Sequence, residues 1–365
     1  MRGRSRSEDV SIDYHACQMS QDTLSEVLRS VRLRGAVFLH VHGEEPWVAE
    51  APPSRALAAA IMPGADHMME YHVVTRGSCW GAVVGERPVR LDAGDVIMFP
   101  HGDAHVMSSA PGLRASAPLD PSAMPRPDQL PVFLNYRGET VALADPQACN
   151  DAGTTVVCGF FGCDMRPFNP LIASLPRLLH VRAADGMHDG WIEQFMRFAV
   201  TESRQKRPGG EALLERLSET MFVELMRRYL DGLPEGQTGW LAGLRDRFVG
   251  RALALLHERP GAGWTIDSLA EKVGLSRSAL HERFAQFTGQ PPMQYLTNWR
   301  MQVASGLLTQ TNANVAAIAL EVGYESEAAF SRAFKRATGT PPAAWRRHRA
   351  ALPQRSAPRH GAPAP

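Results

Sequence analysis

Residues 264–292 read WTIDSLAEKVGLSRSALHERFAQFTGQPP, and this stretch decides the fold of the C-terminal third of the chain. Its apolar residues recur at helical spacing, a glycine interrupts them, and a second apolar pattern follows. Thr265 and Ser276 can accept backbone hydrogen bonds at helix N-termini, while Gly274 can adopt the left-handed conformation that ends a helix. The stretch therefore predicts a helix, a tight turn and a second helix, which are the parts of a helix-turn-helix.

The same unit occurs a second time further along the chain. Residues 314–342 read NVAAIALEVGYESEAAFSRAFKRATGTPP, where Asn314 and Ser326 are the expected N-caps and Gly323 is expected to end the first helix. Between the units, residues 293–308 carry apolar side chains at helical positions and predict a connecting helix roughly 24 Å long. One chain therefore has the parts to hold two reading helices near the spacing of successive major grooves of DNA.

The second helix of each unit is expected to enter the major groove with its outward N-terminal residues. The base-contact candidates are Arg277, Ser278, His281, Glu282, Glu327, Ala328, Ser331 and Arg332. Neighbouring basic residues are predicted to bind phosphates, which sets the register on DNA without reading its sequence. These phosphate-contact candidates are Lys272, Arg283, Lys335, Arg336, Arg346 and Arg347. For each of them singly, a solvated surface charge is the alternative.

Charge is distributed unevenly along the 365 residues, whose net charge is +1. Residues 1–245 hold 24 Lys and Arg against 30 Asp and Glu, whereas residues 246–350 hold 13 against 8. A basic module beside an acidic remainder is typical of a DNA-binding domain joined to a regulatory domain. A surplus of five positive charges is also common on a solvated surface. The repeated helix-turn-helix motif is therefore the stronger indication of DNA binding.

About the last 110 residues resemble the DNA-binding domain of the AraC/XylS family of transcription regulators, which carries two helix-turn-helix units on one connecting helix. The resemblance rests on residues 264–270, 274–278, 287–292 and 319–326. It implies a sequence-specific transcription regulator, an activator or a repressor, that binds double-stranded promoter DNA, with RNA polymerase as a further candidate partner. The alternative is a helical repeat that binds no DNA.

The first part of the chain has the pattern of an all-β sandwich or barrel. Short β-type runs, most of them bounded by Gly, Pro or Asp, occur at residues 36–41, 71–74, 79–84, 96–99 and 154–161. Residues 94–105, which read GDVIMFPHGDAH, resemble the second sequence motif of the cupins. In that family the motif places a histidine inside a small jelly-roll barrel. The resemblance implies a cupin-like jelly roll whose mouth would hold a small-molecule effector.

Four residues are the candidates for an effector pocket or a metal site. The histidine of the cupin-like motif is His105; His72 and Cys158 lie on other predicted strands, and Cys163 follows the run at residues 154–161. Imidazole and thiolate groups suit zinc or iron, so a divalent metal is one hypothesis, although the interpretation requires no cofactor. Hydrogen-bonded histidines and packed cysteines are the alternative. No residue is predicted to be catalytic; the competing class is a metal-dependent cupin enzyme fused to a DNA-binding domain.

The expected organisation has six segments. These are a disordered N-terminus (1–20), the cupin-like sensor domain (21–186), a helical hairpin (187–232), a linker (233–239), the double helix-turn-helix domain (240–348) and a disordered tail (349–365). The hairpin follows from helical periodicity on both sides of a Pro-Gly-Gly turn. It is expected either to cover one face of the sheet or to pair two chains in a homodimer.

The chain is expected to be cytoplasmic and to associate with the nucleoid when bound to DNA. Its basic N-terminus is not followed by the apolar segment of a signal peptide, and it has no apolar run long enough to cross a membrane. Its five cysteines are irregularly spaced in a large chain, which is typical of reduced thiols.

Overall fold

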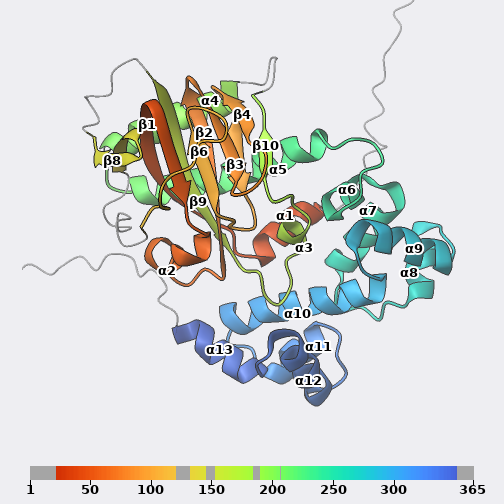
Figure 1. Ribbon diagram of the computed structural model, residues 1–365. Helices are drawn as coiled ribbons and strands as arrows, with labels where there is room; N and C mark the ends of the chain where they lie inside the picture. The colour runs from red at the N-terminus through yellow and green to blue at the C-terminus, as the bar shows by residue number, and fades with distance from the viewer. Residues whose placement is uncertain (1–21, 121–131, 145–152, 184–189, 206, 352–365) are drawn as a thin grey trace, which may run out of the picture.

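The computed structural model describes residues 22–120, 132–144, 153–183, 190–205 and 207–351. They form a β-rich N-terminal half and an all-helical C-terminal half (Figure 1). Among these residues, no helix is both long and apolar enough to cross a membrane. The expected disordered N-terminus lies outside the described residues, and so does most of the expected tail. Residues 349–351 differ from the prediction, because the last helix continues to Ala351.

The strands form a 10-stranded sheet that curves into a half-barrel (Figure 1). They are β1 (Arg34–Ala51), β2 (His67–Arg76), β3 (Ser78–Val83), β4 (Val89–Asp92), β5 (Val96–Phe99), β6 (His105–Ser108), β7 (Val132–Gly138), β8 (Thr140–Leu143), β9 (Thr154–Cys163) and β10 (Leu179–Val181). Their order is β10-β5-β2-β9-β1-β6-β3-β4, with β7 against β1 and β8 against β7. Strand β1 is 18 residues long and pairs with β9 near its start and with β6 near its end. It thereby joins the two layers of the half-barrel.

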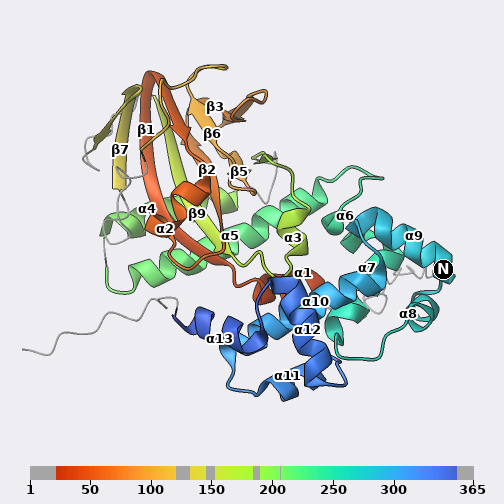
Figure 2. The ribbon, with the colours of Figure 1, turned by 60° about the horizontal axis from the view of Figure 1, so that its bottom comes forward.

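Two long helices, α4 (Gly190–Gln205) and α5 (Gly210–Asp231), belong to this half. Helix α5 lies along the sheet and contacts β1, β9 and β10, with α4 packed on it (Figure 2). The approach is close, because a Cβ on Gly35 of β1 would lie 2.1 Å from the Cβ of Ser218. The hairpin therefore covers one face of the sheet, which is one of the two roles expected for it.

The helical half contains α6 (Trp240–Arg245), α7 (Arg247–Glu258), α8 (Ile266–Val273), α9 (Arg277–Thr288), α10 (Pro292–Gln310), α11 (Val315–Glu321), α12 (Glu327–Thr338) and α13 (Pro342–Ala351). The first helix-turn-helix unit is formed by α8 and α9, the second by α11 and α12, and α10 connects them. The four predicted N-caps all accept a backbone hydrogen bond at their helix starts: Thr265, Ser276, Asn314 and Ser326. Gly274 and Gly323 have φ of 78° and 81°, as the predicted turns require.

Helices α1 (Thr23–Ser30) and α3 (Pro170–Ala173), which the sequence did not predict, link the two halves. Helix α1 contacts α7 and α10, and α3 contacts α6. One apolar cluster consequently runs from the sheet through α1 into the first helix-turn-helix unit, while a second cluster lines the half-barrel and a third lies in the second unit. The first unit is therefore packed against the β domain.

Residues 233–239, the predicted linker, connect α5 to α6 without helix or strand. Two short helical segments, η2 (Ser54–Ala56) and α2 (Ala58–Ile61), lie between β1 and β2.

Candidate functional site

The two reading helices, α9 and α12, are oriented by their buried aromatic and leucine side chains. Leu280 and Phe284 of α9 are fully buried, and so are Phe330 and Phe334 of α12. These side chains fix one face of each helix on its core, so the opposite face points outward. The pattern follows directly from the repeated sequence.

The predicted base-contact residues lie on these outward faces. Seven of them are exposed, namely Arg277, Ser278, His281, Glu282, Glu327, Ala328 and Arg332, and Ser331 is half-buried. Arg277 forms an ion pair with Asp267 of α8 at 3.2 Å, with both side chains largely exposed. Such a surface pair is weak, so the guanidinium stays available to a stronger partner.

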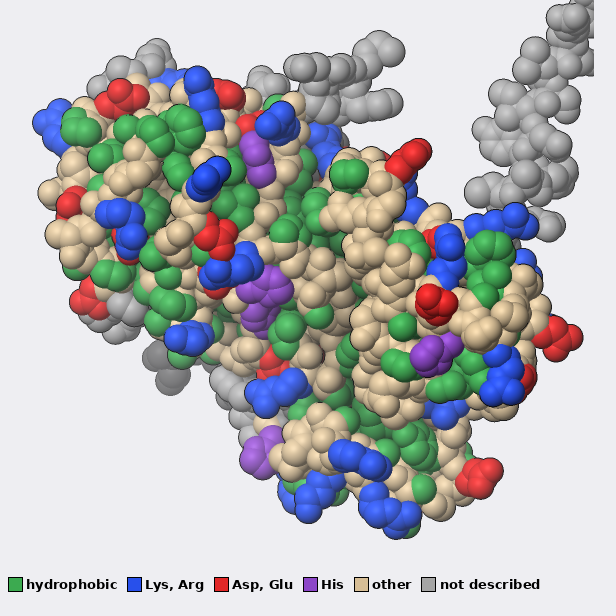
Figure 3. Space-filling model, turned by 45° about the vertical axis from the view of Figure 1, so that its right-hand side comes forward, with side chains coloured by type: hydrophobic (Ala, Val, Ile, Leu, Met, Phe, Trp, Pro, Cys, Tyr) green, Lys and Arg blue, Asp and Glu red, His purple; other side chains and the backbone are tan. Residues whose placement is uncertain are grey.

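The predicted phosphate contacts divide into two groups. Lys272, Lys335, Arg336 and Arg347 are exposed on the helical half. Figure 3 shows Lys and Arg side chains on the outer surface of the lobe formed by α11, α12 and α13. This surface matches a polyanion in charge.

The other group, Arg283 and Arg346, forms hydrogen bonds within the protein, Arg283 from an exposed position and Arg346 from a half-buried one. The guanidinium of Arg283 binds the carboxylate of Asp246, the N-cap of α7, at 2.5 to 3.1 Å. Arg346 donates from Nε and Nη2 to the carbonyls of Leu308 and Ala313, at the end of α10. Both side chains therefore already have partners within the protein, and their phosphate contacts stay predictions.

The half-barrel encloses a cavity of about 690 Å³. Its walls are mostly apolar and include Leu39, Val41, Trp47, Met107, Val132, Tyr136, Val156 and Phe160. Part of β8 also contributes to the lining, and this strand is exposed to solvent along its length. The volume is that of a typical small-molecule site.

Three titratable side chains lie together on the cavity wall, namely Glu70, His72 and His105. Glu70 and His72 are two residues apart on β2 and therefore point to the same face of the sheet. The Nε2 atoms of His72 and His105 are 2.8 Å apart, and Nε2 of His105 is 3.6 Å from Oε2 of Glu70. The predicted pair of histidines is thus brought together, and Glu70 joins it. Glu70 lies one residue before the predicted run at 71–74, so the i, i+2 spacing becomes informative only because β2 begins earlier, at His67.

Burial sets the protonation of this cluster. It raises the pKa of Glu70 to about 8 and lowers that of His105 to about 4, and it holds the pKa of His72 well below its usual value. At neutral pH the carboxyl is therefore mostly protonated and both imidazoles are neutral. Ser54 stabilises the carboxyl by donating a hydrogen bond to Oε1 at 3.1 Å.

The neutral histidines form an ordered chain of hydrogen bonds. Nδ1–H of His105 donates to the carbonyl of Asp103 at 3.2 Å, which leaves its Nε2 as an acceptor. Nε2–H of His72 then donates to that atom, so Nδ1 of His72 accepts from the thiol of Cys158 at 2.9 Å. Cys158 is thus a hydrogen-bond partner of His72.

Cys163 lies apart from this cluster and is a correction to the predicted site. It is five residues from Cys158 on β9, and an odd separation places it on the opposite face of the strand. Its sulfur is instead 3.7 Å from Nδ2 of Asn169, which donates to it.

The donor set of Glu70, His72 and His105 fits a divalent metal. Each of the three side chains offers one nitrogen or carboxylate oxygen, and these three atoms lie within 4.8 Å of one another. Each histidine presents Nε2 to the shared space and has a partner for Nδ1, an arrangement common around metal ligands. A metal would require His72 to carry its proton on Nδ1 and donate it to Cys158. Two imidazoles and a carboxylate suit zinc or iron.

Comparison with known proteins agrees with both halves. The model of a cupin family matches residues 22–231, and that of a helix-turn-helix domain matches residues 269–348. A putative AraC-like transcription regulator from Streptomyces lividans is 33% identical over 291 residues, which cover 79% of this chain and 90% of that protein. The HTH-type transcriptional regulator AlkR from Acinetobacter baylyi is 27% identical over 316 residues, which cover 86% of this chain and 95% of AlkR.

A solved structure of a transcriptional regulator with an AraC-type DNA-binding domain, from Chromobacterium violaceum, is 29% identical, with a TM-score of 0.29, and its match covers 30% of this chain and 97% of that one. Both relatives are named as transcription regulators, the class that the sequence predicts for this chain. The chain belongs to the AraC family of DNA-binding transcription regulators and carries an N-terminal cupin domain.

Proposed function

We propose that a small-molecule effector binds in the cupin cavity and controls DNA binding by the helix-turn-helix units. The observation that carries this proposal is the cavity of about 690 Å³ with apolar walls and one polar cluster. A ligand that fits it has an apolar body and one polar end directed at Glu70 and His105. The protonated carboxyl of Glu70 would donate a hydrogen bond to that end, and burial makes such a bond selective.

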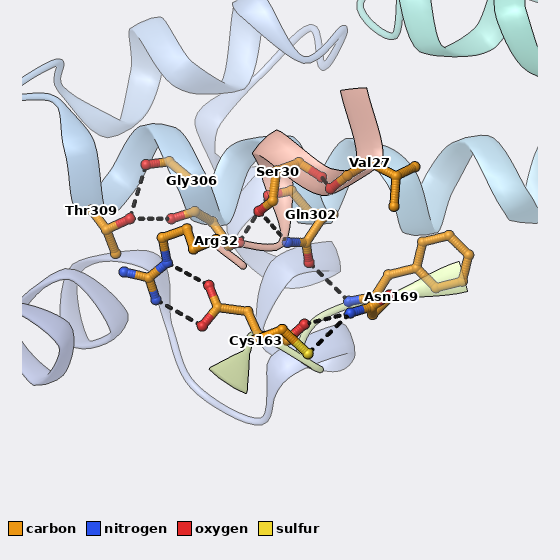
Figure 4. A network of polar contacts seen from close by, with 11 residues as sticks. Val27, Ser30, Arg32, Cys163, Asn169, Gln302, Gly306 and Thr309 are labelled. Carbon is orange, nitrogen blue, oxygen red and sulfur yellow. Dashed lines mark hydrogen bonds and ion pairs between the residues drawn. The ribbon is translucent and has the colours of Figure 1, made fainter. Parts of the chain in front are cut away.

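A route from the cavity to the DNA-binding half supports this proposal. Strand β9 lines the cavity with Cys158 and Phe160, and residues 164–169 follow it directly. This loop and the end of α1 hold Gln302 of α10 between them (Figure 4). Oε1 of Gln302 accepts from the backbone N–H of Phe168 at 3.1 Å, and Nε2 donates to the carbonyl of Ser30 at 2.9 Å.

The loop itself is held in place by charged and polar contacts. The guanidinium of Arg32 binds both carboxylate oxygens of Asp164, at 2.5 and 2.9 Å, and Asn169 donates to the carbonyl of Asp164 at 2.9 Å (Figure 4). Arg32 has a φ of 49°, the one positive value of a non-glycine residue in the described part of the chain. Such a conformation persists only where the surroundings enforce it. A ligand that shifts β9 would therefore act on α10 through this loop.

The DNA-binding form is proposed to be a homodimer, with the outer face of the α4–α5 hairpin as its contact. Phe198 and Leu213 on this hairpin are 46% and 38% exposed, although α5 buries its other face on the sheet. Pairing would allow two chains to read repeated sites. Sedimentation at micromolar concentration should give the mass of a dimer, and a monomer under these conditions would exclude this contact.

A divalent metal at Glu70, His72 and His105 is the second candidate occupant of the cavity, favoured by the donor geometry. Calorimetric titration of the metal-free protein with zinc should give one site per chain. We expect His105→Ala and Glu70→Gln to lose this site, while His281→Ala, on the exposed face of α9, keeps it. Binding that persists in both cavity variants would place the metal elsewhere, and absence of binding to the wild type would leave an organic effector as the occupant.

A further inference from the structure

The two helix-turn-helix units rest on separate apolar cores. The core of the first unit contains Leu280, Phe284 and Leu296 and continues into the cupin domain, whereas that of the second contains Phe330 and Phe334. Helix α10 supplies its N-terminal half to the first core and its C-terminal half to the second. The relative orientation of α9 and α12 therefore depends on what stabilises the middle of α10.

The α7–α8 loop, which leads into the first unit, also touches the second unit directly, at the turn between α11 and α12. A Cβ on Gly261 would lie 2.2 Å from the carbonyl oxygen of Glu321, and a Cβ on Gly323 would lie 2.6 Å from that of Gly261. Backbone meets backbone here, so neither segment can yield by rotating a side chain. Gly323 has in addition the positive φ that its turn requires.

Arg300, near the middle of α10, bridges this contact. Its Nε donates to the carbonyl of Pro260 at 2.7 Å and its Nη2 to the carbonyl of Ala262 at 2.8 Å, both in the α7–α8 loop. Its Nη1 is 3.4 Å from the carbonyl of Gly323, in the turn of the second unit. The side chain is half-buried, and a planar guanidinium holds three such acceptors in fixed directions, which a lysine ammonium does not.

We propose that Arg300 is a positioning residue that sets the separation at which the two units read DNA. This inference rests on the DNA-binding function and goes beyond it, because Arg300 acts through α9 and α12 without touching DNA. With one half of α10 held fixed, a bend of about 10° at its middle moves the end of the other half, an arm of about 14 Å, by about 2.4 Å. That displacement approaches the rise of about 3.4 Å per base pair, so loss of the bridge changes which spacing fits.

The experiment compares the full-length wild type with Arg300→Met in selections from a pool of random duplex DNA. The wild type should enrich two half-sites at one separation. Arg300→Met should keep the sequence preference of each half-site but spread their separation by one or two base pairs. Its affinity for the wild-type site should fall by about tenfold, while its affinity for a duplex with one half-site changes by less than about twofold.

Three further variants separate this role from other roles of an arginine. Arg300→Lys keeps the positive charge but not the planar set of donors, so it should behave like Arg300→Met. If lysine restores the wild-type spacing and affinity, Arg300 is a phosphate contact instead. Gly261→Ala disturbs the same contact without removing a charge and should also spread the separation. Arg251→Met, at an exposed position on α7, is the control and should keep the wild-type spacing.

Thermal melting shows which variants are folded. If Arg300→Met is unfolded, the half-site separation selected by Gly261→Ala tests the proposal in its place. The proposal is overturned if the folded variants keep a single separation, or if paired and single half-sites lose affinity equally. Absence of paired half-sites in the wild-type selection would instead refute reading by both units, and the role of Arg300 with it.

Discussion

Glu70 is a cavity residue whose protonation depends on burial. Burial raises its pKa to about 8 from an ordinary value of 4.5, so the folded protein binds a proton there that the unfolded chain releases. The free energy of unfolding therefore falls as pH rises from 4.5 to 8 because of this group. The depressed pKa values of His72 and His105 act in the opposite direction, but their effect is complete above pH 6.5.

In the wild type, the free energy of unfolding should therefore fall between pH 6.5 and 8 as Glu70 ionises in the folded protein; Glu70→Gln should abolish this fall. We expect the variant to gain about 1–2 kcal/mol relative to the wild type over this interval, as measured by urea unfolding in the presence of a chelator. A difference that does not change with pH would show that the Glu70 carboxyl is already ionised at pH 6.5.

Arg332 is a clear candidate for reading a base, because its long basic side chain is exposed on the outward face of α12. Arg332→Ala should weaken binding to the specific site by about 1–3 kcal/mol and leave binding to random DNA nearly unchanged. Arg336→Ala, a predicted phosphate contact on the same helix, should weaken both by a similar factor. Equal losses on specific and random DNA for Arg332→Ala would make it a phosphate contact as well.

The helices of the C-terminal half were predictable from local sequence, whereas several elements of the other half were not. The caps at Ser276 and Ser326 and the turn at Gly274 act within a few residues, so short patterns specify them. Strand β1 is far longer than its apolar run, because it pairs with different strands at its two ends. Helix α1 and the bridge at Gln302 depend on segments more than 100 residues apart, which no local pattern records.

The cavity cluster was predictable in part for the same reason. The cupin-like motif indicated His105, and strand alternation could have added Glu70 to His72. The same alternation argues against Cys163, because it lies five positions after Cys158, and an odd offset places the two side chains on opposite faces of the strand.

Helix α10 should respond to the cupin domain through Gln302, which is fully buried. Gln302→Leu leaves the backbone groups of Phe168 and Ser30 without partners, at a cost of about 1–3 kcal/mol for each such group, so the melting temperature should fall. Amide exchange should accelerate in α1 and in residues 164–169. Gln294→Leu, at an exposed position of the same helix, is the matched control and should change neither. Unchanged exchange in Gln302→Leu would show that the contact does not couple the two halves.

The whole molecule consists of the cupin domain and two helix-turn-helix units, which share their apolar cores unequally. The first helix-turn-helix unit shares an apolar cluster with the cupin domain, while the second unit has its own core. Helix α10 spans both units and contacts the cupin domain through Gln302. A change in the cupin cavity therefore has a physical path to the relative placement of the two reading helices.

Sequence-specific DNA binding by both units is tested most directly by selecting genomic fragments with the purified full-length protein, at physiological salt and with random DNA as competitor. We predict enrichment of one or a few promoter regions that share two half-sites at a constant separation, and loss of this enrichment in Arg332→Ala. Fragments enriched no more than random DNA, with and without zinc, would contradict this function.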